Sequence, residues 1–393
     1  MQRFTSSFLR PLLAGATALA ACLSAPTAQA AGSLIDVTKF VVGGNTALCD
    51  GVADDTAFLQ GALTAALAAK SGLYFPAGTK CRTRTTLTLN KLITLKGDGP
   101  SVSHLIYAPL NPTTNTGNAI DVIPPVRPIT CAMLGGPSGS IAENIGHTIT
   151  GLDITPEVED AGSGNGIYVF LQCGAPYAYF DYSNLRIGRF GGLGLLMDNS
   201  IQNEDGIFGG RITNSLIWNG INIINIGDSV HFDKVVAAGR HNVALSGLGG
   251  ARQVSWTGGQ VSTDNGAFVL NGVHGFRARD VWIEEQGPCT ATAPAVCLTA
   301  AITVLNSWDD VFEGMTFNVN VNTSLTTVFA LYGAKDTKII NNNFTNRGSV
   351  SHIYGGATGP NFTSRTRIEG NNYYLQADSQ PFTPQVVFDP GSN

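Results

Sequence analysis

A short segment recurs along most of this chain. Each copy has two apolar residues five positions apart, with a small polar residue or glycine soon after the first. The clearest copies are Ile149–Ile154, Ile212–Ile217, Trp256–Val261, Ala278–Ile283, Phe312–Phe317, Ile339–Phe344 and Ile368–Tyr373, and looser ones begin at Phe180 and Phe232. The closest copies begin at residues 212 and 232 and the most widely spaced at 278 and 312. A drifting period of this length is typical of a solenoid.

Each copy has the features of a corner between two short strands. The first apolar residue would end one strand facing inward, and the second would start the next strand facing inward. The Asn or Gly between them tolerates left-handed dihedral angles and can bond to its neighbours in the stack. A third apolar strand recurs at residues 166–169, 194–197, 220–223, 267–270, 301–304 and 328–331.

Three strands per turn, stacked roughly 4.8 Å apart, describe a parallel β-helix, which is an all-β solenoid. An antiparallel β-sandwich also gives short strands with Gly and Asn turns. The repeated order of corner, strand, loop and strand favours the solenoid. Because the interior of such a solenoid is packed with side chains, we expect any functional site on an outer face.

The first thirty residues have the pattern of an export signal. Arg3 and Arg10 form a basic start, residues 11–23 are an apolar run, and Ala28–Ala30 has the small residues of a cleavage site. The run is too short to span a membrane comfortably. We therefore predict a secreted or periplasmic protein. A lipoprotein anchored at Cys22 is the alternative, because residues 19–22 resemble a lipoprotein box.

The composition of the remainder argues against two kinds of partner. Only 13% of the residues are charged and 43% are hydrophobic, which is low charge with ample apolar material for one elongated core. Without residues 1–30 the chain keeps 21 basic and 28 acidic residues, a net charge of −7. Such a mildly acidic surface gives no support for nucleic acid or anionic membrane as a partner.

Six cysteines follow the export signal, an even number that favours disulfides in an exported chain. They are Cys49, Cys81, Cys131, Cys173, Cys289 and Cys297. Cys289 with Cys297 is the easiest local pair and Cys131 could be tied to Cys173, but the sequence leaves the pairing open. The chain has no CxxC motif and no His/Cys cluster, so we expect no zinc site.

A helical pattern precedes the first coils. Apolar residues at helical spacing run from Phe58 to about Lys70, and Ser71–Gly72 ends the pattern. Asp54 or Asp55 would cap the first amides, and a carboxylate suits the positive end of a helix. The alternative, that these acids form a catalytic pair, is disfavoured.

Three motifs in the opening carry a family resemblance. Gly51-Val52-x-Asp54-Asp55-Thr56, Tyr74-Phe75-Pro76-x-Gly78 and Leu95-Lys96-Gly97-Asp98-Gly99-Pro100 resemble the start of the pectate-lyase superfamily, in the branch with polygalacturonase-like hydrolases, lyases and tailspike-type depolymerases. The match covers residues 35–108, and the coil pattern extends it loosely to about residue 375. The resemblance implies a single-stranded right-handed parallel β-helix with an N-terminal capping helix over residues 55–70, and a carbohydrate ligand. It implies no particular reaction, because the fold hosts hydrolases, lyases, epimerases and non-catalytic proteins.

These patterns divide the chain into an export signal, 1–30, a β-helix domain, 31–375, and a C-terminal tail, 376–393. Within the domain, we expect residues 35–80 to form the cap and about 86–375 to form the coils. Two segments, 108–148 and 287–295, lack the repeat. We predict loops or irregular turns there.

Loops that follow the second apolar residue of each repeat should fall in register from turn to turn. Aligned in this way, Trp218–Asn219, Gly239–His241, Ser262–Asn265, Glu284–Gln286 and Asn318 form one row. The row offers an aromatic platform, cations and carboxylates. From it and the neighbouring strands we predict catalytic roles for Glu284, Asp264, Glu285 and His241, and substrate binding by Arg240, Trp218, Asn219, Trp282 and Arg279. The alternative is that these groups merely solvate an exposed loop row.

Asp264 and Glu284 suit hydrolysis of a glycosidic bond, which needs one carboxylic acid and a second carboxylate. We expect their strands to be adjacent, with backbones about 5 Å apart. Side-chain splay could widen the gap to the roughly 6.5–9.5 Å of inverting enzymes. Ser262–Gly266 faintly resembles the Asn-Thr-Asp segment of polygalacturonases, and Val281–Glu284 resembles the aromatic-x-Glu strand of tailspike-type proteins. The other polygalacturonase motifs do not follow in family order, which weakens the first match.

We therefore predict a secreted polysaccharide-cleaving enzyme, a glycoside hydrolase that needs no cofactor. The first alternative is a lyase that cleaves a uronate-containing glycan by β-elimination, for which Arg240 together with His241 could supply the cation and the base. A lyase could use Ca²⁺, although no row of Asp residues resembling a lyase calcium site is apparent. The second alternative is a non-catalytic glycan-binding protein. The oligomeric state stays open, and a trimer is one option because tailspike-type proteins trimerise.

Overall fold

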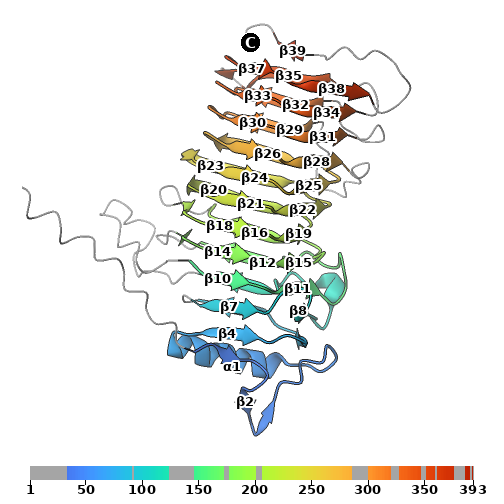
Figure 1. Cartoon of the computed structure of the whole chain (residues 1–393). Coiled ribbons are helices and arrows are strands. Elements are labelled where there is room, and N and C mark those ends of the chain that lie inside the picture. The colour runs from blue at the N-terminus through green and yellow to red at the C-terminus, as the bar shows by residue number, and fades with distance from the viewer. Residues whose placement is uncertain are drawn as a thin grey trace, which may run out of the picture.

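The chain winds into a column of short parallel strands, with one helix across its N-terminal end (Figure 1). The computed structural model describes residues 33–90, 93–123, 146–171, 177–200, 206–285, 300–319, 327–346, 351–358, 361–375, 386–389 and 392. Strands far apart in sequence lie side by side, and almost all pair in parallel. The predicted right-handed parallel β-helix with an N-terminal capping helix is thereby confirmed.

Among the described residues, the strands form three long sheets that follow one another in every turn. Sheet 1 contains β1 (Ile35–Asp36), β4 (Gly72–Phe75), β7 (Thr94–Gly97), β10 (Thr148–Thr150), β14 (Asp181–Ser183), β18 (Arg211–Thr213), β21 (His231–Asp233), β24 (Ser255–Thr257), β27 (Arg277–Arg279), β30 (Val311–Glu313), β33 (Lys338–Ile340) and β37 (Arg367–Glu369). Sheet 2 contains β5 (Thr79–Thr83), β8 (Ser103–Tyr107), β11 (Asp153–Pro156), β15 (Arg186–Ile187), β19 (Leu216–Trp218), β22 (Val236–Gly239), β25 (Gln260–Thr263), β28 (Trp282–Glu285), β31 (Thr316–Val319), β34 (Asn343–Asn346) and β38 (Asn372–Leu375).

Sheet 3 completes each turn before the chain returns to sheet 1. It contains β6 (Leu87–Leu89), β9 (Ile120–Val122), β12 (Ile167–Phe170), β16 (Leu195–Asp198), β20 (Ile221–Asp228), β23 (Val243–Arg252), β26 (Phe268–Val273), β29 (Ala300–Leu305), β32 (Thr327–Tyr332), β35 (Ser351–Thr358) and β36 (Asn361–Phe362), with β13 (Tyr177–Ala178), β17 (Ile207–Phe208) and β39 (Val386–Phe388) beside it. The segment after Ala108 is more regular than predicted, because β9 pairs with β6 and β12 after a short 3-10 helix, Pro112–Thr114.

The corner between sheets 1 and 2 is the recurrent segment seen in the sequence. Its turning residue has positive φ, as at Asn214 (48°) and Asn341 (55°), and Lys234 (53°) and Asp280 (55°) adopt the same conformation. Each corner amide bonds to the turn above, for example Asn214 N to Asp233 O at 2.9 Å. The left-handed backbone conformation is tolerated even at Lys234, which has a long side chain, because the stacked turns on both sides hold the backbone in place.

Inward side chains stack in columns along the solenoid. The sheet 1 register places Ile212, Phe232, Trp256 and Ala278 directly above one another. The rings of Phe232 and Trp256 stack at 4.5 Å, and Trp256 is fully buried, as predicted. Complete burial of a large apolar side chain contributes about 1.5–3 kcal/mol, so this column is a main source of stability.

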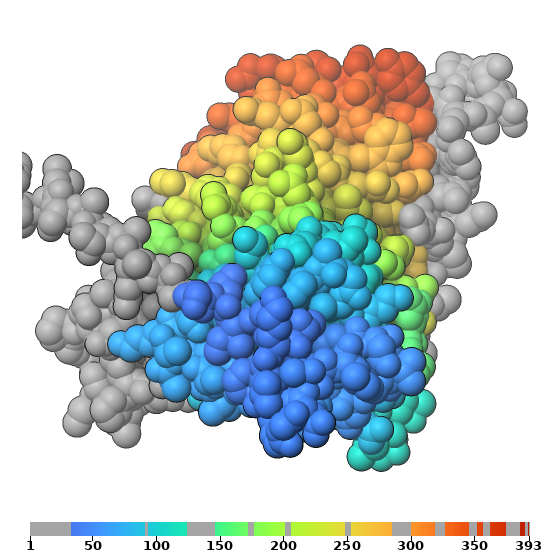
Figure 2. Space-filling model, turned by 60° about the horizontal axis from the view of Figure 1, so that its bottom comes forward, coloured from blue at the N-terminus to red at the C-terminus, as the bar shows by residue number. Residues whose placement is uncertain are grey.

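The N-terminal end is closed by α1 (Thr56–Ala69), which buries Leu59, Leu63 and two alanines against the first turn. Figure 2 shows this end coming forward, with the N-terminal residues covering the base of the column. Asp54 accepts the amide of Thr56 at 3.1 Å, as a cap should.

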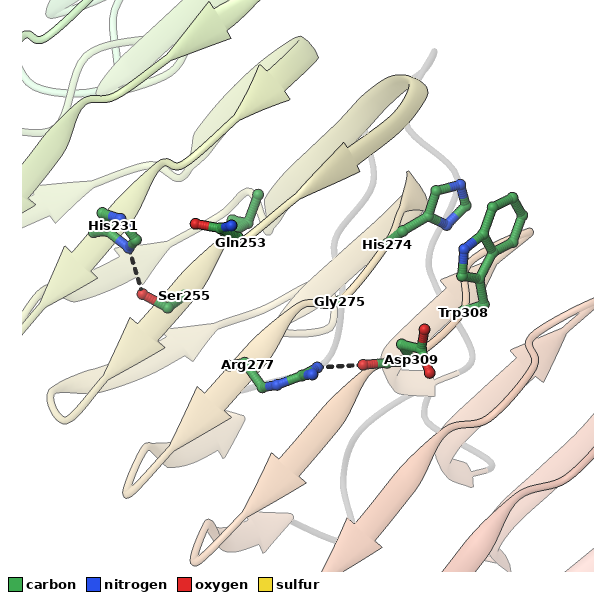
Figure 3. A pocket seen from close by; sticks show the side chains of 9 residues that line it. His231, Gln253, Ser255, His274, Gly275, Arg277, Trp308 and Asp309 are labelled. Carbon is green, nitrogen blue, oxygen red and sulfur yellow. Dashed lines mark hydrogen bonds between the residues drawn. The ribbon is translucent and has the colours of Figure 1, made fainter. Parts of the chain in front are cut away.

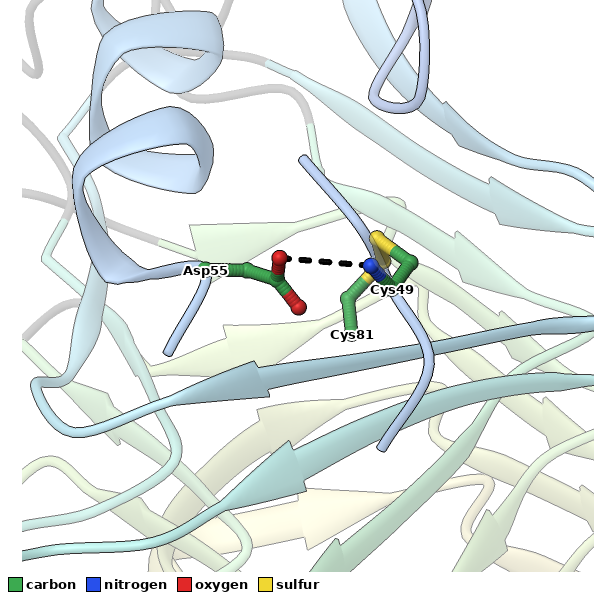
Figure 4. A group of neighbouring side chains, drawn as sticks. All are labelled: Cys49, Asp55 and Cys81. Atoms are coloured by element: carbon green, nitrogen blue, oxygen red, sulfur yellow. Dashed lines mark hydrogen bonds between the residues drawn. A yellow bond between two sulfur atoms is a disulfide. The ribbon is translucent and has the colours of Figure 1, made fainter. Parts of the chain in front are cut away.

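Asp55 has a different role from the predicted cap, because its side chain makes no capping bond to the helix. It is buried, and its carboxylate accepts the backbone amides of Leu48, Cys49 and Arg82. Beside it Cys49 and Cys81 form a disulfide (Figure 4). Asp55 therefore ties the entering chain to β5.

Several predictions from the sequence fall on other parts of the chain. The export signal with Cys22, the cysteines at 131, 173, 289 and 297, and most of the C-terminal tail lie outside the described residues. Within the described part, no helix has the length and apolar character needed to cross a bilayer.

Candidate active site where sheet 2 turns into sheet 3

The predicted loop row is a real column in sheet 2. Strand register pairs Trp218 with Ala238, Ala238 with Ser262, Ser262 with Glu284, and Glu284 with Asn318. The loops that leave these strands toward sheet 3 therefore begin at the same level of each turn. Residues distant in sequence can meet at this edge of the solenoid.

Asn219 fixes the path of two of these loops. It is completely buried, and its Nδ2 donates to Asp160 Oδ1 at 2.8 Å and to the carbonyl of Phe190. Its Oδ1 accepts the amide of Arg240 at 3.3 Å. The preceding Gly239 has φ 104°, and a Cβ there would lie 2.5 Å from Asn219 Oδ1. Asn219 is thus a positioning residue, with its amide engaged by the protein.

Two arginines share one carboxylate at this edge. Asp160 Oδ2 lies 2.6 Å from Arg189 Nη2 and 3.1 Å from Arg240 Nη2. The Asp160 side chain is 14% exposed, and Glu159 approaches Arg189 only at 3.9 Å from an exposed position. The Arg189 guanidinium lies 5.9 Å from the centre of the Trp218 ring, a cation–π contact. We call Asp160, Arg189, Trp218, Arg240, His241 and Asp264 the edge cluster.

The pKa values of two groups in the edge cluster move in opposite directions. Burial raises the pKa of Asp264, and the nearby Arg189 and Arg240 offset only part of this effect. Burial, together with the positive charge of Arg240, lowers the pKa of His241, against a smaller opposing effect of Asp160. Asp264 therefore holds its proton to higher pH than usual, and His241 is neutral at neutral pH.

The other predicted residues belong to the strands β27 and β28 rather than to the edge cluster. Glu284 and Trp282 lie on the outward face of sheet 2, and Glu284 Oε2 accepts Gln260 Nε2 at 3.0 Å. Glu285 pairs with Thr263 in the register, and its side chain is outside the described part. Arg279 lies on sheet 1, where its Nη2 is 2.8 Å from Glu313.

The sequence interpretation missed Asp160 and Arg189. Both follow strands of earlier turns, β11 and β15, and the predicted row did not extend to those turns. Asp160 lies in an insertion before β12. No sequence pattern indicates that this insertion folds back toward the edge where sheet 2 turns into sheet 3. The run of acids at residues 157–160 was the one available signal.

A second polar patch lies on the outward face of sheet 3. Asp121 and Tyr168 are register partners, and Tyr168 donates to Asp198 Oδ2 at 3.3 Å. Burial raises the pKa of Asp121, and burial together with Asp198 raises the pKa of Tyr168 to about 12. These groups were also missed, because the interpretation followed loops rather than strand faces. They give sheet 3 a hydrogen-bonding surface next to the edge cluster.

Among the described residues, one group of three potential metal-ligating side chains is close enough to share an ion, namely Cys49, Asp55 and Cys81. The two sulfur atoms are joined as a disulfide (Figure 4), so they offer no thiolate ligand. The third member is bonded to backbone amides. This group is part of the cap.

Comparison with known proteins identifies the fold. No protein-family model matches the chain, and no curated protein sequence matches it. The A-module of mannuronan C-5 epimerase AlgE6 from Azotobacter vinelandii is similar in structure, with 15% identity, a TM-score of 0.53, and coverage of 90% of this chain and 97% of that one. DFA-IIIase from Arthrobacter chlorophenolicus A6, in complex with DFA-III, has 14% identity, a TM-score of 0.52, and coverage of 91% and 92%. At these identities the likeness shows a shared β-helix fold.

Proposed function

We propose that this protein is an exported glycan-processing enzyme that cleaves a uronate-containing polysaccharide by β-elimination at the edge cluster. The observation that carries the proposal is the pair of opposite pKa shifts, at Asp264 and His241, beside two guanidinium groups. Groups whose environments push their pKa values apart are suited to acid and base roles. The Cys49–Cys81 disulfide fits an oxidising compartment outside the cytoplasm.

β-Elimination needs three contributions from the protein. A cation must neutralise the uronate carboxylate, because the C5 proton is otherwise too weakly acidic. A base removes that proton, and the released electron pair forms the C4=C5 double bond as the C4–O bond breaks. An acid then protonates the departing glycosidic oxygen.

The edge cluster offers a residue for each role. Arg189 and Arg240 share Asp160, and their remaining N–H groups can bind a substrate carboxylate. His241, neutral because its pKa is lowered, is the base. Asp264, protonated to higher pH because its pKa is raised, is the acid. The proton gained by His241 returns to water after product release.

The neighbouring structures support a carbohydrate substrate by analogy of fold. The name of the Azotobacter epimerase places its reaction at sugar C5 of mannuronan. Removal of a C5 proton is also the first event of elimination. The analogy supports a carbohydrate as the class of substrate. The assignment of catalytic roles to particular residues depends on the edge cluster alone.

Hydrolysis is the second candidate, because Asp264 and Glu284 come from adjacent paired strands. A raised pKa at Asp264 also suits the general acid of a glycosidase. Glu284 would then activate water. Two facts favour elimination. Glu284 is aligned with Ser262, which comes two residues before Asp264. The carboxylate of Glu284 is also hydrogen-bonded to Gln260. Hydrolysis also leaves the paired arginines and neutral His241 without a role.

The test is incubation of the full chain with polygalacturonate, alginate and a panel of neutral polysaccharides. Elimination releases reducing ends together with the ultraviolet absorbance of an unsaturated sugar. We expect both signals from an acidic polymer, and a strong reduction of both in the His241→Ala variant. Reducing ends without absorbance would establish hydrolysis instead. Retention of a polysaccharide without any change in it would indicate a non-catalytic glycan-binding protein.

A further inference from the structure

A groove of about 730 Å³ lies at the opposite edge of sheet 3, where the chain returns to sheet 1. Figure 3 shows side chains from successive turns converging around it. Its lining includes His231, Gln253, Ser255, His274, Arg277 and Trp308. None of these residues belongs to the edge cluster, so the groove is a separate feature of the surface.

One end of the lining is formed by a tryptophan that stacks on a histidine. The Trp308 ring stacks on His274, with centroids 3.2 Å apart and planes inclined by 14°. His274 is 6% exposed, whereas Trp308 is 45% exposed. The backbone is also held, because Gly275 N donates to Trp308 O at 2.8 Å. Trp308 therefore presents a fixed indole surface to solvent at little cost in side-chain entropy.

Polar groups from the neighbouring turns line the rest of the groove. His231 Nδ1 and Ser255 Oγ are 2.8 Å apart, and Arg277 donates to the carbonyl oxygens of Phe276 and Asp309. Gln253 adds an exposed amide. A groove that combines a flat apolar surface with hydrogen-bonding groups beside it matches a sugar, whose ring has an apolar C–H face and hydroxyls at its rim. The lining carries opposite charges at Arg277 and Asp309, so a fixed negative charge is not required of the ligand.

The groove and the edge cluster are connected by the same strands. The chain runs from Asp264 through β26 directly to His274, and from His241 through β23 to Gln253. Six residues in β26 at about 3.3 Å each span roughly 20 Å. The outward side of sheet 3 between the two edges carries the paired residues Ser246 and Asn271. One extended molecule could thus contact both edges.

We propose that the Trp308 groove is a distal glycan-binding subsite, which holds a sugar of the same polysaccharide whose reacting unit lies at the edge cluster. The connection to catalysis rests on the proposed function above. Binding of a sugar by the groove does not depend on it. A polysaccharide would then lie across sheet 3, along the direction of its strands.

The test compares Trp308→Ala with Trp308→Phe and with Tyr374→Ala, which removes an aromatic of similar exposure (55%) from another part of the surface. Uronate oligomers shorter and longer than roughly 20 Å serve as substrates. Loss of one stacking contact should raise KM for long oligomers about 3- to 10-fold, with kcat unchanged and KM for short oligomers unchanged. Trp308→Phe should restore most of the affinity, and Tyr374→Ala should behave as wild type. An unchanged KM for long oligomers, or an equal change for short ones, would overturn the subsite.

Affinity electrophoresis in gels that contain polygalacturonate, alginate or a neutral glucan separates this proposal from the proposed function. Trp308-dependent retention without catalysis would keep the groove and reject the reaction. Catalysis with no effect of Trp308 on retention or KM would reject the groove and keep the reaction. If none of the polysaccharides in the gel slows the wild-type protein, the groove is rejected as a glycan site. Circular dichroism and thermal unfolding check that each variant is folded.

Discussion

Arginine–carboxylate pairs occur both on the outward face of sheet 1 and in the edge cluster, and the two regions use them differently. On sheet 1, Arg211 pairs with Asp181 at 2.6 Å and Arg279 with Glu313 at 2.8 Å, each across neighbouring strands. Both arginine side chains are more than 60% exposed. In the edge cluster two arginines converge on one carboxylate that is largely buried.

The difference shows which charges remain available to a ligand. In a solvent-exposed pair of one arginine and one carboxylate, the two charges neutralise each other. Such a pair stabilises the fold by at most about 1 kcal/mol. Two arginines that share one carboxylate keep N–H donors that can bind a ligand. The partial burial of the site strengthens the electrostatic effect of their charges on neighbouring groups. Burial is the main cause of the shifted pKa values of Asp264 and His241, while Arg240 adds to the lowering at His241 and both arginines oppose the raising at Asp264. The following predictions test whether the contrast between the two regions is functional.

The largest effect is expected for His241→Ala. Loss of a positioned general base typically costs about 10²–10⁴-fold in rate, so kcat on the acidic polysaccharide should fall by that factor. Initial rates from ultraviolet absorbance measure it. A variant that stays within a few-fold of wild type would remove His241 from the mechanism.

Arg240→Gln should lower kcat/KM by about 10²–10³-fold, as loss of an electrostatic stabiliser does. Arg279→Gln is the matched control, because it removes the same charge from the sheet 1 pair with Glu313. We expect it to leave kcat/KM unchanged and to lower the free energy of unfolding by at most about 1 kcal/mol. Equal losses in the two variants would mean that the regions do not differ in function.

The dependence of kcat/KM on pH should show a mildly acidic optimum. The base must be neutral, so activity is lost below the lowered pKa of His241, which lies under its ordinary value of about 6.5. The acid must be protonated, so activity is lost above the raised pKa of Asp264, which lies over its ordinary value of about 3.9. In Asp264→Asn the alkaline limb should disappear along with most of the rate. An alkaline optimum would contradict the acid role of Asp264.

The smallest effect in the site region is expected for Glu284→Gln. This side chain is bonded to Gln260 on the face of sheet 2, and elimination gives it no part in the reaction. The rate should therefore remain close to that of wild type. A loss of activity comparable to that of His241→Ala would favour hydrolysis by Asp264 and Glu284.

The features that could be predicted from the sequence are those that follow from its repeated apolar pattern. The Asn corners, the buried Trp256 and the column from Trp218 to Asn318 all follow from one periodic pattern of apolar side chains. Arg279 was grouped with the site although the corner at Asp280 places it on another sheet. Arg279 and Glu284 are only five positions apart in sequence, but the corner between them turns the chain to another outer face.

What the sequence could not predict depends on loops that do not repeat. Asp160 reaches Arg189 and Arg240 from an insertion whose path is set by Asn219 and by backbone bonds to other turns. Asp55 looked like a helix cap because its position is right, yet its carboxylate faces away from the helix to bind three amides. Such contacts are settled by tertiary geometry, which a local pattern does not contain.

The edge cluster draws its members from the end of β19 and from the loops that follow β11, β15, β22 and β25, so that each successive layer of the column contributes to it. No contiguous fragment shorter than that span contains the whole site. Deleting a single layer could preserve a well-packed rod and still abolish the arrangement of charges. A change in the number of layers between Asp160 and Asp264 is therefore a means by which this architecture could lose or exchange an activity while its interior stays intact.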